Sequence, residues 1–179
     1  MVDPVTTRRW LYRGLFLVLA TLFLFGRLLP LSTLPSAWPA PDFLLCLAFA
    51  WVLRRPDFLP VVVIATVFLI EDMLLVRPPG LWTLIVLFAT EFLRDRANLT
   101  RDLPFFVEWA MVAAVMLVML LANRLVLAIF MVPQSGFGLT LMQFVASVAA
   151  YPIVVLVSNR VLGVRWVAPG EVEALEHRL

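Results

Sequence analysis

Two adjacent carboxylates, Glu71 and Asp72, lie in an apolar run and are the residues best placed to do chemistry. A carboxylate at the centre of a membrane helix costs on the order of 2.5 to 3.5 kcal/mol, so it indicates a proton site, a substrate site or an ion pair. Neighbouring residues on a helix point about 100° apart, so we expect only one of the two to face a helix bundle. We favour a structural ion pair with Arg77 or Arg124 that fixes the helix register, and a functional site remains the alternative.

Catalytic patterns that need several partners are incomplete in this sequence. The single histidine, His177, lies in the polar C-terminal stretch, so a Ser–His protease or a multi-histidine metal site lacks an essential residue. Ser135-Gly136 has no base in the apolar runs and is interpreted as a turn. Acid-only chemistry stays open, but we expect no enzyme activity, no catalytic residue, no metal and no cofactor.

The composition defines what must position these groups. Of 179 residues, 63% are hydrophobic and 15% are charged, and the mean hydropathy is +1.01. A soluble domain of this size buries only about two-thirds of its surface, which excludes a water-soluble fold, and disorder needs low hydrophobicity. The net charge of +2 is too small and too scattered for a nucleic-acid surface. The sequence therefore predicts an all-α integral membrane protein.

Prolines, glycines and charge clusters divide the chain into six apolar segments of the kind that cross a bilayer. Residues 1–165 are predicted to form a six-span domain, and residues 166–179 a short cytoplasmic tail. The fifth segment is too long for one crossing, so we place the outer interface at Asn123-Arg124, with Arg124 reaching toward the head groups. Residues 125–132 then lie along the membrane or continue as a tilted stub. The predicted spans are about Leu11–Leu29, Pro39–Leu53, Phe58–Val76, Leu81–Leu93, Leu103–Arg124 and Leu139–Asn159, the last with a kink at Pro152.

Arginines are distributed unevenly between the two sides of this topology. One side has Arg27, Arg77 and Arg124 only, and the positive-inside rule makes the other side, with both termini, cytoplasmic. The arginines of that other side are Arg8, Arg9, Arg13, Arg54, Arg55, Arg94, Arg96, Arg101, Arg160, Arg165 and Arg178. We interpret Arg54, Arg55, Arg94 and Arg96 mainly as solvated topology signals, and contact with anionic membrane lipids is the alternative.

Small residues recur every fourth position in the fifth and sixth segments. The repeats are Ala110 to Ala114 and Ala146 to Ala150. Helices in lipid approach closely along such faces. We expect the two segments to pack against each other here, and docking of a partner's helix is the alternative.

Four short motifs follow one another in the middle of the chain, within residues 41–96. They are Pro41-Asp42-Phe43-Leu44-Leu45-Cys46-Leu47, Arg55-Pro56-Asp57, Glu71-Asp72-Met73-Leu74 and Pro79-Gly80-Leu81-Trp82. Their order resembles the rod shape-determining MreD family. The resemblance implies a proline at the head of the second span (Pro41), an aspartate near the outer end of the third (Asp72), and the turn Pro79-Gly80-Leu81.

The resemblance also implies a function and a set of partners. It implies a multi-pass scaffold of the bacterial inner membrane that joins an MreC-type single-span protein, the MreB filament, and a RodA-type synthase with its transpeptidase in the cell-elongation machinery. Asp72 and the turn that ends at Trp82 are expected to shape the outer face.

The MreD family is similar in fold to the S components of energy-coupling-factor transporters, so a substrate-binding transporter subunit is the competing function. Such a subunit needs a polar, aromatic pocket near its outer loops. We expect no such pocket, because these loops are short and proline-rich.

Overall fold

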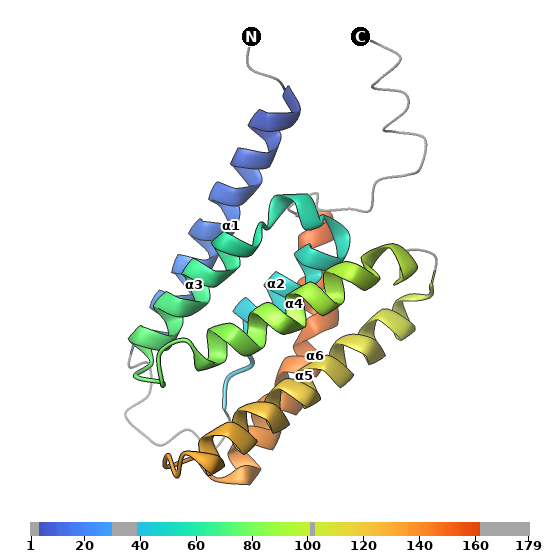
Figure 1. Cartoon of the computed structure of the whole chain (residues 1–179). Helices are drawn as coiled ribbons and strands as arrows, with labels where there is room; N and C mark the ends of the chain where they lie inside the picture. Colours follow the sequence, from blue (N-terminus) through green and yellow to red (C-terminus); the bar gives the residue numbers. More distant parts are fainter. Residues whose placement is uncertain (1–3, 30–38, 101–102, 162–179) are drawn as a thin grey trace.

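The computed structural model describes residues 4–29, 39–100 and 103–161, and these ranges contain helices and no strand. Successive helices run in broadly opposite directions, which places the start of α1 and the end of α6 on one side (Figure 1). We call that side the terminal end, and the side with the α3–α4 turn and the α5–α6 loop the turn end. The elements are α1 (Pro4–Leu28), α2 (Phe43–Arg54), the short 3₁₀ helix η1 (Pro56–Phe58), α3 (Val61–Leu74), α4 (Leu81–Thr100), α5 (Phe105–Ile129) and α6 (Phe137–Arg160).

Helix α2 is the centre of the bundle. Every residue from Leu44 to Arg54 is buried, and the helix packs against α1, α4 and α6. Burial on all sides explains why its sequence is a continuous apolar run without a polar face. Trp51 is fully buried, contacts Phe16 and Tyr12 of α1 through its ring, and donates its indole N–H to the Ser158 hydroxyl at 3.3 Å. The core therefore forms around the shortest α-helix.

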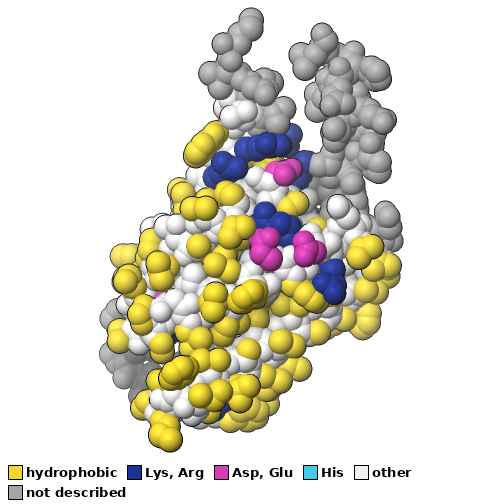
Figure 2. Space-filling view, in the orientation of Figure 1, with side chains coloured by type: hydrophobic (Ala, Val, Ile, Leu, Met, Phe, Trp, Pro, Cys, Tyr) yellow, Lys and Arg dark blue, Asp and Glu magenta, His cyan; other side chains and the backbone are white. Residues whose placement is uncertain are grey.

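Among the described residues, three helices are long and apolar enough to cross a membrane: Thr6–Leu28 within α1, α5 and α6. Their outward side chains are apolar, as at Val18 and Val118, both 65% exposed. Hydrophobic side chains cover the flank of the molecule in Figure 2, and basic side chains gather toward the terminal end. Exposed apolar surface of this extent marks a membrane protein, because water would not tolerate it.

Two helices extend beyond the ends expected from the sequence. Helix α4 passes through Arg94-Asp95-Arg96 to Thr100, and α5 passes through Asn123-Arg124 to Ile129. Neither site contains a proline or glycine to end a helix, and the charged side chains find partners at the periphery. Arg94, for example, donates to the Leu59 carbonyl at 2.7 Å. Residues 125–129 thus continue the same helix, as the second of the two alternatives foresaw.

Pro152 lies inside α6, and the helix continues past it to Arg160. Proline has no N–H, so the carbonyl four residues earlier, at Val148, has no intrahelical donor. The indole N–H of Trp109 on α5 donates to this carbonyl at 2.9 Å. A neighbouring helix therefore satisfies the backbone group that Pro152 leaves free, as helices in lipid require.

Helices α3 and α5 both end in a Schellman turn with a non-glycine residue in the left-handed conformation. Val76 follows α3 with φ 52°, and Met131 follows α5 with φ 52°. In each turn the following N–H reaches back five residues, from Arg77 to the Asp72 carbonyl and from Val132 to the Leu127 carbonyl. Glycine is the usual residue at such a position, because a Cβ is strained there.

We expect Val76→Gly to raise the free energy of unfolding by about 1 kcal/mol, because it removes this strain. Val76 is 91% exposed, so little packing is lost. Met73→Gly, one turn earlier in α3 and 67% exposed, is the matched control and should lower the free energy by about 1 kcal/mol. Equilibrium unfolding in mixed micelles measures both, and a destabilised Val76→Gly variant would contradict the assignment of strain.

Candidate functional site

Asp72 and the α3–α4 turn form one hydrogen-bonded unit at the turn end. The Asp72 Oδ2 atom accepts from the Gly80 N–H at 3.1 Å, the Thr83 N–H at 3.1 Å and the Thr83 hydroxyl at 2.9 Å. These N–H groups belong to the start of α4, so Asp72 caps that helix from a distance, and its charge suits the positive helix end. Gly80 has φ +88°, a backbone conformation that residues other than glycine rarely adopt.

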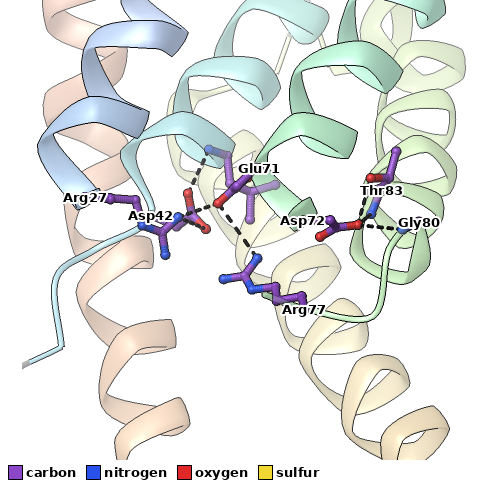
Figure 3. Close-up of polar contacts among 8 residues, drawn as sticks. Arg27, Asp42, Glu71, Asp72, Arg77, Gly80 and Thr83 are labelled. Carbon is purple, nitrogen blue, oxygen red and sulfur yellow. Dashed lines mark hydrogen bonds and ion pairs between the residues drawn. The ribbon is translucent and has the colours of Figure 1, made fainter. Parts of the chain in front are cut away.

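Glu71 points to the other side of α3 and enters an ionic cluster with Arg27, Asp42 and Arg77 (Figure 3). Its Oε1 atom lies 2.5 Å from Arg27 Nη1 and 3.8 Å from Arg77 Nη1. Arg27 Nη1 also lies 3.5 Å from Asp42 Oδ2. Two positive and two negative charges thus meet where α1, α2, α3 and the turn converge.

The prediction that only one of Glu71 and Asp72 faces the bundle is wrong, because both side chains are fully buried. The predicted divergence holds: Glu71 faces α1 and α2, whereas Asp72 faces α4 (Figure 3). Helix α3 packs between these neighbours, so side chains on two different faces of the helix are buried. The expected ion pair with Arg77 is present, but Arg27 is the closer partner.

Asp42 joins three helices, although no role was predicted for it. It is the N-cap of α2, with Oδ1 accepting from the Leu45 N–H at 3.2 Å. Its own N–H donates to the Ser147 hydroxyl on α6 at 2.8 Å. An aspartate directly before an apolar run is an N-cap signature, so this signal was present in the sequence. Arg27 had no comparable local signal.

A second ionic cluster is buried near the terminal end of α2. Arg54 and Glu108 form a two-point pair, with nitrogen–oxygen distances of 2.9 and 3.2 Å. Tyr151 on α6 donates its hydroxyl to Glu108 Oε1 at 2.6 Å. All three residues are more than nine-tenths buried. The cluster ties α2, α5 and α6 together.

In the part of the chain that the structure describes, Arg124 does not reach a carboxylate. It donates to the Thr140 hydroxyl at 2.9 Å and to the Ser135 carbonyl at 3.3 Å, and so holds the α5–α6 loop against both helices. Within residues 4–29, 39–100 and 103–161 it forms no ion pair, and the alternative in which it neutralises Glu71 or Asp72 is wrong.

A cavity of about 320 Å³ lies at the turn end, between the start of α2, the α3–α4 turn, α5 and α6. The expectation of no polar, aromatic pocket near the outer loops is therefore wrong. The reason is that much of its polar lining comes from helix faces, which a survey of loop composition does not count. Its lining includes Asp42, Arg77, Trp82, Asn123, Arg124, Gln134, Gln143, Phe144 and Ser147.

The small-residue repeats do not form the expected joint face. Helices α5 and α6 do pack together, but Ala110 and Ala114 are exposed, Ala146 is half-buried and only Ala150 is buried. The polar residues Trp109 and Glu108 face α6 instead, because their hydrogen bonds need partners there. The prediction that the two repeats pack against each other is thus wrong for the repeat on α5.

Several predicted features lie outside the described residues, namely the loop at 30–38, the tail at 166–179 and His177. In the described ranges, no three His, Cys, Asp or Glu side chains gather as a metal site would require. Pro79 and Leu81 flank Gly80 in the turn, and Trp82 lies beneath the Arg77 guanidinium at 5.4 Å.

The fold and site define an all-helical membrane protein with a buried ionic cluster at each end of its central helix. Comparisons with protein-family models, with curated proteins and with solved structures give no match.

Proposed function

We propose that the chain is a non-catalytic, six-span scaffold of the MreD type in the bacterial inner membrane. In this proposal it binds an MreC-type single-span protein, and through that partner the MreB filament and a RodA-type synthase with its transpeptidase. The observation that carries the proposal is the contact between Asp72 and Gly80. Asp72 and Gly80 belong to two of the motifs that carry the resemblance. In this structure they are joined in one turn, which sets the angle between α3 and α4.

The alternation of helix direction supports six crossings, three of them by α1, α5 and α6 (Figure 1). Helix α2 has 12 residues and spans only about 18 Å. A short, broken crossing is tolerated in lipid when protein covers it, and α2 is enclosed by α1, α4 and α6. Arg13 lies in the first half of α1, Arg55 directly follows α2 and Arg96 lies near the end of α4, and this supports cytoplasmic termini.

The test is a pull-down of the tagged protein from its own host membranes in a mild detergent, with co-purifying proteins identified by mass spectrometry. We expect an MreC-type single-span protein to co-purify, and Asp72→Ala to reduce its yield severalfold relative to the bait. Glu91→Gln, a change at the half-exposed pair with Arg94 on α4, is the control and should leave the yield unchanged. Folded bait without any such partner would contradict the proposal.

A substrate-binding subunit of a membrane transporter is the second candidate. The cavity at the turn end favours it, since ligand sites are concave and combine apolar walls with a few polar groups. The same pull-down separates the two candidates. Co-purification of an ATPase module with its coupling subunit would support the transporter function.

A further inference from the structure

The cavity at the turn end carries more positive than negative charge. Arg77 and Arg124 line it from two sides, and Asp42 is the single acidic residue among the described lining residues. Asp42 is already paired with Arg27. Residues 30–38, which connect α1 to α2, contain no Asp or Glu that could neutralise the arginines. Arg77 has the Glu71 carboxylate at 3.8 Å, whereas Arg124 has no ion pair within the described residues. A guanidinium without a counter-charge beside apolar walls is costly unless an anion joins it.

Two buried nitrogens of lining residues have no hydrogen-bond acceptor among the described residues. They are Arg77 Nη1, which has only a 3.8 Å ion pair with Glu71, and Trp82 Nε1. Both groups can only donate hydrogen bonds, so only an acceptor can pair with them. Buried donors are nearly always paired, and an acceptor-rich molecule in the cavity would pair them.

The remaining walls of the cavity indicate which non-polar part such a molecule would have. Leu45, Met116, Leu120 and Phe144 line the cavity with apolar surface. A volume of about 320 Å³ matches the small end of ligand pockets. Asn123 and Gln143 add amides that can orient a polar substituent.

We infer that this cavity binds a small organic anion, in which a carboxylate or phosphate pairs with Arg77 and Arg124 and an apolar body packs against α5 and α6. The anion is either a free molecule or the head group of a lipid. Arg124 serves as the main anchor, because its present acceptors are a hydroxyl and a carbonyl that a charged oxygen can replace. The inference deepens the second candidate, and the scaffold proposal does not depend on it.

The test uses the full chain in phosphatidylcholine nanodiscs, titrated calorimetrically with phenyl phosphate and with benzoate. A second preparation contains phosphatidylglycerol, and native mass spectrometry measures the lipid that stays bound. We expect Arg124→Gln to weaken the binding of whichever anion binds by at least about tenfold. Arg96→Gln removes the same charge from an exposed position at the other end and should change binding less than about twofold.

A second variant guards against misfolding of Arg124→Gln. Leu127→Trp adds bulk to the cavity wall without removing a charge or a hydrogen bond, and it should also weaken binding. Binding of phenyl phosphate or benzoate that both variants weaken supports a free anion. Retention of phosphatidylglycerol alone, lost in both variants, supports a lipid head group. No binding of any of these, or binding that neither variant weakens, overturns the inference, and neither result bears on the MreC-type partner.

Discussion

Glu108→Ala should lower the free energy of unfolding by about 3 to 5 kcal/mol, one of the two largest effects expected in this protein. The substitution leaves the Arg54 guanidinium buried without its counter-charge, since Arg54 is 4% exposed and its two-point partner is gone. It also removes the acceptor of the Tyr151 hydroxyl. Reversible unfolding from dodecyl maltoside micelles by added dodecyl sulfate measures the change.

Removing the whole cluster should be far less harmful than removing one member. The triple variant Arg54→Met, Glu108→Met and Tyr151→Phe replaces every polar partner with an apolar side chain, so no buried charge or hydroxyl is left unpaired. We expect it to regain most of the stability that Glu108→Ala loses.

Glu91→Gln is the matched control for a carboxylate paired with arginine at a half-exposed site. Its side chain is 44% exposed beside Arg94, so the change should be under about 1 kcal/mol. If Glu108→Ala proved as mild as Glu91→Gln, the cluster would have no structural role.

Asp72→Ala should lower the free energy of unfolding by about 2 to 4 kcal/mol, the second large effect. One oxygen of Asp72 accepts three hydrogen bonds from Gly80 and Thr83, and the alanine leaves these donors without an acceptor at the start of α4. The same unfolding experiment measures this change.

Two further variants test whether the cap causes the effect. Asp72→Asn keeps one acceptor oxygen but loses the charge, so it should lose about 1 kcal/mol. Thr83→Val removes one of the three donors and should also lose about 1 kcal/mol, since the backbone N–H still binds Asp72. Equal losses in Asp72→Ala and Asp72→Asn would show that the charge matters and the cap geometry does not.

The sequence by itself determined that the protein is a membrane protein and how many α-helices to expect. A hydrophobic content of 63%, cut by proline and charge clusters, was enough to predict six apolar helices, and the described ranges contain six α-helices. The apolar run predicted a helix at about 39–53, where α2 lies at Phe43–Arg54, and Pro79-Gly80 indicated the turn before α4. These signals are local: a helix, a turn and burial in lipid depend on residues that are neighbours in the chain.

Only the tertiary structure decided which charges meet and where a cavity remains. Arg27 and Glu71 are 44 residues apart, and Arg54 and Glu108 are 54 apart, so no local pattern relates them. From the sequence, Arg77 and Arg124 were equally good candidate partners for the carboxylates. In the structure, α3 packs between α1 and α4, and Glu71 therefore pairs with Arg27 and Arg77. The cavity likewise depends on how α5 and α6 meet the α3–α4 turn, because its walls come from four separate stretches of chain. Pairing and packing are properties of the bundle as a whole, which is why composition and periodicity could not supply them.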